Sequence, residues 1–317
     1  MTGTPRTPGT PGSGAGARTG AARDVRAPRP GDQVAVVAPS GPVDPGKLDA
    51  GVAWLRGLGL EVRLGKHVHD RWGYLAGDDA GRAADLQDAW CDPEIAAVLC
   101  ARGGYGAMRV LDHLDWPALA AAAPKRLQGS SDITALHVAF GDRLGVATAF
   151  GPMVATLLAD PDPVSEETAR AALLGDPRPV TGGHPLVPGR AAGPLTGGNL
   201  SLLVALLGTP YAPPPARGRI VLLEDVGEQP YRVDRMLTQL LISGWLDGAA
   251  GLALGSWTDC GDPVRLRAVL AERLGGLGVP VVAGLPVGHG APQHTVTLGA
   301  GALLDADSGT LAPEPRG

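Results

Sequence analysis

Short runs of apolar residues alternate with segments of helical periodicity along the first half of the chain. Continuous apolar runs at residues 33–38 (QVAVVA) and 95–101 (IAAVLCA) predict buried strands, and EVRLG, from Glu61, predicts another strand between them. Helices are predicted at residues 48–58, 80–90, 107–114 and 133–143. Strands and helices that alternate in this way favour a parallel sheet with helices on both faces.

The second half of the chain has a different pattern. Residues 159–190 are rich in proline, glycine and acidic residues around one predicted helix at 166–174, which suggests a crossover between domains. Beyond it, the pattern predicts a helix from about 199, a strand from 219, a helix at 230–244, a strand at 248–257 and a tail of short β segments at 294–314. We therefore predict one α/β domain at 30–158, the crossover at 159–190 and a second α/β domain at 191–317.

Composition and charge argue against several classes of protein. Hydrophobic residues make up 44% of the 317 residues and charged residues 19%, which is usual for a globular protein, and the net charge of -5 gives no general attraction for nucleic acid. The three cysteines include no CxxC pair, so neither a disulfide framework nor a zinc knuckle is indicated. No window approaches the ~18 uninterrupted apolar residues of a membrane span. The first 29 residues lack the apolar segment of a secretory signal, and we predict a disordered leader.

Ligands bind beyond the carboxyl ends of the strands in a parallel sheet, so the segments after the predicted strands are candidate sites. These segments are PSG at 39–41, RGGYG at 102–106 and QGSSD at 128–132. In QGSSD a strand runs through a sharp turn into a helix, and the G-x-S frame selects Ser131 as a candidate nucleophile. Gly129 would allow close packing before the turn, and the backbone N–H of Asp132 would face a developing oxyanion. The competing interpretation is that Ser131 or Asp132 only caps the helix.

A serine nucleophile needs a base, and the base needs a group that orients it. The predicted strand RIVLLED carries Glu224 at the sheet edge where sites form, and VVAGLPVGHGAPQ places His289 between two glycines that would leave its ring accessible. Taken alone, these are typical of a solvated strand end and a loop histidine, so only their joint presence indicates a site. RGGYG lacks the dinucleotide-binding frame, and no spacing of histidines and carboxylates indicates a metal site. We expect neither a metal nor a cofactor.

Several motifs, in order along the chain, resemble the LD-carboxypeptidase family of serine peptidases. They are VAPSGPV at 37–43, ARGGYGAMRVLDHLDW at 101–116, QGSSDITAL at 128–136, FGPM at 150–153, GGNLSLLVALLGTP at 197–210, LEDVGEQPYRVDRML at 223–237 and GLPVGHG at 284–290. The match runs from about residue 31 to the C-terminus and leaves only the leader outside. The resemblance implies an N-terminal doubly wound, flavodoxin-like domain, a C-terminal α/β domain with a barrel-like sheet, a site between them and a homodimer.

The same resemblance implies a cytoplasmic enzyme of peptidoglycan recycling. It would remove the terminal D-alanine from murein tetrapeptides by cleavage between the L-centre of meso-diaminopimelate and D-alanine. The serine, glutamate and histidine of the family's catalytic set fall on Ser131, Glu224 and His289. His289 would accept the proton of Ser131 during attack on the carbonyl, while Glu224 would hold the imidazole in the required tautomer. The backbone N–H groups of Asp132 and Gly104 would stabilise the oxyanion, and no metal is required.

Three further polar residues are candidates for contacts with the substrate, which we expect to be a small murein peptide. Arg102, directly after a predicted strand, would pair with a carboxylate of the peptide or would form a structural salt bridge. Asn199 in GGNL and Arg232 in PYRVDR would line the cleft. Ser130, beside the candidate nucleophile, would touch the substrate or nothing. We expect no nucleic-acid partner and no membrane partner.

Two other functions remain open at this point. The microcin C immunity peptidases share the fold and the triad of the family but cut the amide that joins an aminoacyl group to a nucleotide analogue; EQPYR, at 228–232, resembles the murein branch more closely. The second alternative is a non-catalytic muropeptide-binding protein, although a sensor does not need three catalytic groups. Both meso-diaminopimelate and lysine remain alternatives for the third residue of the peptide.

Overall fold

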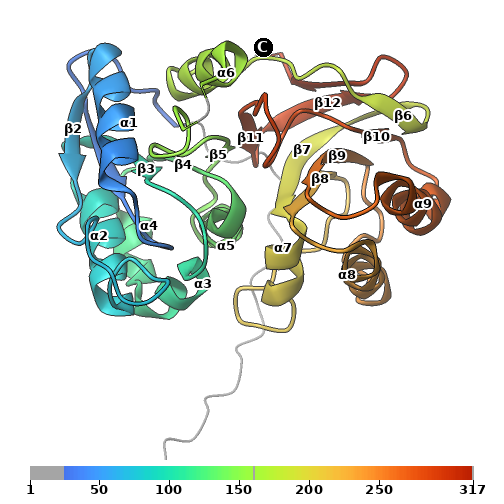
Figure 1. Cartoon of the computed structure of the whole chain (residues 1–317), viewed down its shortest axis with the longest axis horizontal. Helices are drawn as coiled ribbons and strands as arrows, with labels where there is room; N and C mark the ends of the chain where they lie inside the picture. Colours follow the sequence, from blue (N-terminus) through green and yellow to red (C-terminus); the bar gives the residue numbers. More distant parts are fainter. Residues whose placement is uncertain (1–24, 160, 316–317) are drawn as a thin grey trace, which may run out of the picture.

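The computed structural model describes residues 25–159 and 161–315 of the chain. These residues form two β-sheets that lie side by side, each with helices packed against it (Figure 1). Of the predicted leader, residues 1–24 lie outside the described part. Val25 is buried in the core of the first domain, and Arg26 forms an ion pair with Asp32 at 2.7 Å. The last residues of the predicted leader are therefore part of the fold.

The first sheet has the strand order β11-β5-β4-β3-β1-β2. Its five N-terminal strands are parallel to one another, and their order, 2-1-3-4-5, is that of flavodoxin-like doubly wound folds. They are β1 (Gln33–Val37), β2 (Glu61–Leu64), β3 (Ile95–Cys100), β4 (Arg126–Gly129) and β5 (Thr148–Phe150). The accompanying helices are α1 (Pro45–Gly57), α2 (Asp79–Cys91), α3 (Ala107–Val110), α4 (Trp116–Ala121) and α5 (Thr134–Leu144). The predicted doubly wound fold is confirmed.

Alternate residues of the central strand β1 pack against opposite layers of helices. Val34 and Val36 lie in a cluster with the buried side chains of α1, whereas Ala35 and Val37 lie in a cluster with those of α2 and α5. Since successive side chains of a strand point to opposite faces, a strand covered on both sides must be apolar at every position. This is why residues 34–37 of β1, VAVV, form an unbroken apolar run.

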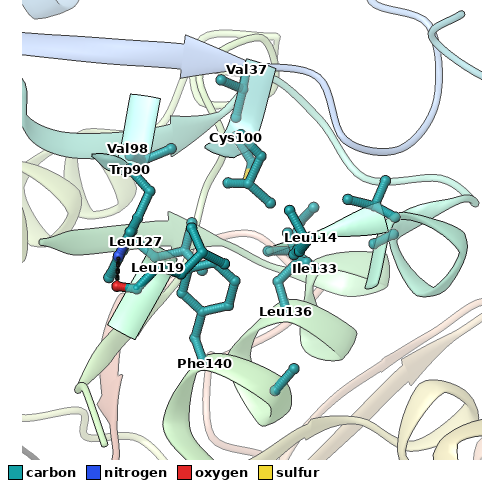
Figure 2. Close-up of a cluster of buried hydrophobic side chains, with 14 of the residues drawn as sticks. Val37, Trp90, Val98, Cys100, Leu114, Leu119, Leu127, Ile133, Leu136 and Phe140 are labelled. Atoms are coloured by element: carbon teal, nitrogen blue, oxygen red, sulfur yellow. Dashed lines mark hydrogen bonds between the residues drawn. The ribbon is translucent and has the colours of Figure 1, made fainter. Parts of the chain in front are cut away.

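The second of these clusters anchors the helix that follows the candidate nucleophile (Figure 2). Phe140 of α5 packs edge-on against Trp90, with ring centroids 4.8 Å apart, and the indole N–H of Trp90 donates to the backbone oxygen of Leu119 at 3.2 Å. Ile133 and Leu136 are fully buried in the same cluster. Burying such side chains stabilises the fold by about 1.5–3 kcal/mol each. The first turn of α5, directly after the turn of Ser131, is therefore fixed in place by the core.

The second sheet has the strand order β13-β12-β7-β8-β9-β10-β6 and curls into a half-barrel (Figure 1). Strands β7, β8, β9 and β10 are parallel to one another, while β6, β12 and β13 pair antiparallel with their neighbours. The strands are β6 (His184–Val187), β7 (Arg190–Asn199), β8 (Ile220–Val226), β9 (Gly251–Thr258), β10 (Val281–Ala283), β12 (Gly301–Asp305) and β13 (Thr310–Pro313). The helices of this half are α6 (Pro163–Leu173), α7 (Leu200–Leu206), α8 (Pro230–Ile242) and α9 (Pro263–Leu274).

Aspartates mark the start of five helices, α1, α2, α4, α6 and α9. Each accepts a hydrogen bond from a backbone N–H of the first turn, which that turn cannot satisfy within the helix; the five are Asp44, Asp78, Asp115, Asp162 and Asp262. In α1, α4, α6 and α9 a proline occupies the first or second helical position, where its missing N–H costs nothing. The Asp262–Pro263 pair signals the start of a helix in this way, but helix α9, which begins there, was not predicted from the sequence.

Two strands lie across the predicted domain boundaries. Strand β11 (Val296–Leu298) comes from the predicted second domain, yet it pairs antiparallel with β5 at the edge of the first sheet. Strand β6 comes from the predicted crossover and pairs with β10 in the second sheet. The chain therefore returns to the first sheet shortly after His289.

Candidate active site

Ser131 lies in the turn between β4 and α5 and has a left-handed backbone, with φ of 59°. This region is unfavourable for a residue with a side chain and is typical of a nucleophile held on a sharp strand-to-helix turn. A Cβ on Gly129 would lie 2.9 Å from the side chain of Ile133, so only glycine lets the turn close so tightly. Ser131 is partly exposed, and its hydroxyl makes no hydrogen bond with any described residue. The hydroxyl is thus accessible to a substrate.

The side chain of Asp132 connects three loops at the carboxyl edge of the first sheet. It is buried and accepts hydrogen bonds from the hydroxyl of Ser40 at 2.6 Å and from the backbone N–H of Ala107 at 2.8 Å. Burial raises the pKa of this carboxyl, although both hydrogen bonds oppose that effect. Only its backbone N–H was expected to have a role; this group lies in the first turn of a short helix, where such groups lack helical partners.

The RGGYG loop packs directly against Ser131. A Cβ on the buried Gly103 would lie 3.0 Å from Cβ and 3.3 Å from Oγ of Ser131, so a side chain at this position would displace the serine. The carbonyl of Gly103 accepts a hydrogen bond from the N–H of Gly41 at 3.1 Å. Gly104 follows with φ of 115°, and its N–H donates to no oxygen of the described residues. Gly104 therefore has a free donor, in the residue next to the one that packs against Ser131.

Arg82 of α2 holds this loop in place and was missed by the sequence analysis. Its side chain is fully buried, and it donates hydrogen bonds to the backbone oxygens of Pro39 and Gly106, which belong to two of the three candidate loops. Asp79 neutralises its charge and also accepts from Arg109. A charged residue in a helix normally faces solvent, so periodicity gives no signal for this role.

Glu224 and His289 form a hydrogen-bonded pair. Nδ1 of His289 lies 2.7 Å from Oε2 of Glu224, whose side chain is fully buried, whereas that of His289 is 24% exposed. The loop of His289 can approach only because Gly288 has no side chain: a Cβ there would lie 2.4 Å from the same carboxylate oxygen. Gly290 fixes the other side of the loop by donating its N–H to Ser256 Oγ at 2.9 Å. The structure thus brings together two of the three predicted catalytic residues in direct contact.

Asn199 does not line a cleft, contrary to the expectation from its motif. It is 2% exposed, and its Nδ2 donates to Glu224 at 3.2 Å and to Asp225 at 2.9 Å. Its Oδ1 accepts from the hydroxyl of Ser201 and the backbone N–H of Leu202. All four of its hydrogen-bonding positions are used within the protein. Asn199 therefore positions the carboxylate of Glu224 and is not available to a substrate.

Two hydrogen bonds across the domain boundary align the segment of Ser131 with the other half of the site. Thr134 Oγ1, in the first turn of α5, accepts from the backbone N–H of Asn199 at 3.0 Å. On the other side, Gln293 donates through Nε2 to Ser130 Oγ at 3.3 Å, so Ser130 is occupied by the protein. Among the described residues no hydrogen bond joins Ser131 to His289, and in free enzymes such contacts are often long and shorten with substrate.

Arg102 lies beside Gly104 with part of its guanidinium free. Its Nε donates to the backbone oxygen of Gly103 at 3.1 Å and its Nη1 to that of Pro42 at 3.2 Å. Its Nη2, which lies 3.4 Å from where a Cβ on Gly104 would be, has no partner in the described part of the chain. No carboxylate of residues 25–159 or 161–315 pairs with it either, so the structural salt bridge that we considered is absent.

Arg232 makes no contact with the other candidates. It lies exposed in the first turn of α8, where it pairs with Glu228 at 3.5 Å and donates to the hydroxyl of Tyr231 at 3.3 Å. The predicted role of Arg232 in substrate binding therefore has no support from its contacts.

The described residues give little support for a metal site, a reactive cysteine or a membrane-spanning helix. Between 25 and 159 and between 161 and 315, no group of three histidine, cysteine, aspartate or glutamate side chains is arranged to hold a metal ion. Within the same residues the cysteines are unpaired, and burial raises the pKa of the thiols of Cys91, Cys100 and Cys260, which disfavours the reactive thiolate. None of the helices there is long and apolar enough to cross a membrane.

The site has the parts needed for acyl transfer through a serine nucleophile. They are a partly exposed serine on a strained turn, free backbone donors beside it and a histidine held by a buried carboxylate.

Known proteins carry the same sequence features. Models of the LD-carboxypeptidase N-terminal and C-terminal domains match residues 34–151 and 192–304. A Streptomyces coelicolor protein named as a carboxypeptidase is 57% identical over 89% of this chain and 93% of its own length. The murein tetrapeptide carboxypeptidase of Pseudomonas aeruginosa is 37% identical over 87% of this chain and 94% of its own.

Solved structures agree with this relationship. The muramoyltetrapeptide carboxypeptidase from Oxalobacter formigenes superposes with a TM-score of 0.76 at 30% identity, over 88% of this chain and 97% of that one. The structure of MccF in complex with glutamyl sulfamoyl guanosine superposes with a TM-score of 0.83 over 92% and 98%, but at 23% identity this likeness shows the shared fold alone. The protein belongs to the LD-carboxypeptidase family and is a serine-type peptidase.

Proposed function

We propose that this enzyme is a serine LD-carboxypeptidase that removes the terminal D-alanine from murein tetrapeptide, in cytoplasmic peptidoglycan recycling. The observation that carries the proposal is the buried carboxylate of Glu224 at 2.7 Å from Nδ1 of His289, with the segments beside both residues hydrogen-bonded to the turn of Ser131. The names of the relatives in Pseudomonas aeruginosa and Oxalobacter formigenes support the same substrate class.

In the proposed reaction, Nε2 of neutral His289 accepts the proton of Ser131 as Oγ attacks the carbonyl carbon of the third peptide residue. The N–H groups of Gly104 and Asp132 donate to the oxyanion that forms, and losing one such donor typically costs about 2.7–4 kcal/mol. The C–N bond then breaks, and His289 returns the proton to the amine of the leaving D-alanine. Water attacks the acyl-enzyme by the same path and frees the tripeptide.

The pH dependence of the reaction follows from the surroundings of His289. Burial lowers the pKa of this imidazole, but the hydrogen bond and charge of Glu224 and the charge of Asp225 outweigh burial, so the pKa is raised above the ordinary histidine value. Since only neutral His289 accepts a proton, activity is lost as the pH falls through this raised pKa. We expect the acidic limb of the kcat/KM profile to have its midpoint above the value of about 6.5 for a free histidine. A midpoint below that value would contradict this account of the base.

Arg102 is our candidate for recognition of the terminal carboxylate, which an exopeptidase must detect. Its free Nη2 lies next to Gly104, and the terminal carboxylate of the substrate is separated from the scissile carbonyl by a single residue. A hydrogen bond to a charged group contributes about 1.5–3 kcal/mol, so Arg102→Ala should lower kcat/KM by about 10- to 100-fold.

The control for Arg102 is a tetrapeptide that ends in a carboxamide. The native enzyme should prefer the free acid over this amide, and Arg102→Ala should lose most of that preference. A merely structural role would lower both rates together and leave their ratio unchanged, because Arg102 also supports Gly103 and Pro42. An unchanged ratio would therefore exclude Arg102 as the carboxylate contact.

The test of the proposed function is mass spectrometry of the purified protein with L-Ala-D-Glu-meso-diaminopimelate-D-Ala. We expect loss of one alanine from this peptide, no loss from the same peptide ending in L-Ala, and no loss with Ser131→Ala. A second candidate is hydrolysis of the amide in aminoacyl-nucleotide analogues, which the fold shared with MccF favours. Cleavage of glutamyl sulfamoyl adenosine, with the tetrapeptide left intact, would select that candidate.

A further inference from the structure

An open pocket of about 580 Å³ adjoins the site on the side of the RGGYG loop. It is lined by Gly41, Pro42, Tyr74, Arg102, Gly104 and Tyr105. Arg102 and Gly104 belong to the site already described, whereas Tyr74 and Tyr105 have no part in the proposed chemistry. Both tyrosines are largely exposed, at 64% and 51%, so two large rings gather at the surface beside the candidate site.

A rigid turn holds Tyr74 at the pocket. Trp72 and Leu75 exchange two backbone hydrogen bonds of 2.9 Å, and Gly73 between them supplies the left-handed backbone, with φ of 58°, that the turn requires. Leu75 and Ala76 are fully buried, and the N–H of Ala76 donates to the backbone oxygen of Ser40 at 2.9 Å. The exposure of Tyr74 is therefore built into the turn.

Tyr105 completes an aromatic wall. Its ring packs edge-to-face with that of Tyr74, with centroids 5.6 Å apart. The next residue, Gly106, lies so close to the turn that a Cβ there would be 2.6 Å from a side-chain carbon of Leu75. The RGGYG loop and the turn of Tyr74 thus form one packed unit, with both rings facing the pocket that also holds Gly104.

We infer that this pocket receives the side chain of the leaving residue, and that it accepts D-residues with aromatic side chains as well as D-alanine. The inference rests on the proposed function. If Gly104 binds the oxyanion and Arg102 the terminal carboxylate, the leaving residue lies between them, and its side chain meets the remaining wall of Pro42, Tyr74 and Tyr105. A methyl group is small beside two tyrosine rings, so the side chain of D-alanine would leave most of this wall uncovered.

The wall also predicts which side chains are preferred. Aromatic rings stack favourably, edge-on or offset, on tyrosines that are already fixed in place, while neither ring offers a charge to a polar side chain. We expect kcat/KM for a tetrapeptide ending in D-phenylalanine to exceed that for D-alanine by about fivefold, within the range typical of one aromatic pair. A tetrapeptide ending in D-glutamate should be the poorest of the three substrates, since its side-chain carboxylate would find no free cation among the described residues of the pocket: the terminal carboxylate takes up Arg102, and Arg109 is paired with Asp79.

The experiment compares tetrapeptides that differ only in the last residue, D-alanine, D-phenylalanine or D-glutamate, by the rate of tripeptide release. In Tyr74→Ala and Tyr105→Ala, the ratio of D-phenylalanine to D-alanine should fall about fivefold. Tyr231→Ala is the matched control, because Tyr231 is equally exposed, at 58%, but lies on α8 and does not line the pocket. This control should leave the ratio unchanged.

The outcomes of this experiment distinguish the inference about the pocket from the proposed function. If D-alanine is released but D-phenylalanine is resistant, or if the tyrosine variants leave the ratio unchanged, the inference about the pocket is wrong and the proposed function stands. If neither the D-alanine nor the D-phenylalanine peptide is cleaved, the proposed function is wrong, and the inference falls with it.

Discussion

Ser131→Ala is expected to lower kcat for release of D-alanine by about 10⁶-fold, the scale seen when the nucleophile of a serine peptidase is removed. The hydroxyl is the only attacking group that the proposed reaction provides, and the pKa of the nearby buried thiol, Cys100, is raised so that no thiolate replaces it. Substrate should still bind, because Gly104 and Arg102 are untouched. The measurement is single-turnover release of the tripeptide together with binding of the intact tetrapeptide by calorimetry.

Ser131→Gly is the informative control for this variant. A residue with a side chain at φ of 59° costs roughly 1–2 kcal/mol relative to its right-handed form, and glycine is free of that cost. We expect both variants to be inactive, with Ser131→Gly more stable to urea than Ser131→Ala. Activity above one-hundredth of the native kcat in either variant would exclude Ser131 as the nucleophile.

Glu224→Gln is expected to lower kcat by about 10⁴-fold, although it changes neither size nor shape. Nδ2 of Asn199 donates a hydrogen bond to Oε1 of Glu224, and Oδ1 of Asn199 already accepts two hydrogen bonds. The Asn199 amide therefore cannot flip to exchange its oxygen and nitrogen. The glutamine must therefore place its oxygen towards Asn199 and its NH₂ towards His289. Nδ1 of His289 then has to accept that hydrogen bond, which leaves its proton on Nε2, where it cannot accept the proton of Ser131.

Nitrogen chemical shifts of His289 report the tautomer directly, so they test this argument apart from the rate. Glu228→Gln is the matched control, because Glu228 follows the same strand but only pairs with Arg232 at 3.5 Å on the surface. We expect Glu228→Gln to keep the native rate and tautomer. If Glu224→Gln retained a tenth of the native kcat, Glu224 would not be the group that orients His289.

Two of the three catalytic candidates were within reach of the sequence because each lies at or just beyond the end of a readable strand. Ser131 follows β4, and Glu224 lies two residues before the end of β8, which begins as an apolar run; ligands bind at that edge of a parallel sheet. His289 has no such strand signal; its place between two glycines made it a candidate base, and the resemblance to a known family then grouped it with the other two. The structure adds the hydrogen bond that joins it to Glu224.

The roles of the positioning residues could not be predicted from the sequence, because they depend on contacts between segments that are far apart along the chain. Whether Asn199 faces a cleft or a buried carboxylate depends on β8, which lies beside it in space but about twenty-five residues away in sequence. Arg82 and Gln293 act through contacts between loops that no local periodicity encodes. The pairing of β11 with β5 was missed for the same reason, since a three-residue strand gains its stability from its partner.

That pairing decides which part of the chain can fold by itself. Within the described residues, β11 covers the outer edge of β5 and closes the first sheet with a strand donated by the C-terminal half. A polypeptide that ended after residue 159 would leave β5 with a row of unpaired N–H and C=O groups, which is a template for pairing with another chain. Strand donation thus makes the edge of the first sheet depend on the C-terminal half, and it places the chain seven residues after His289 at the sheet that carries Ser131.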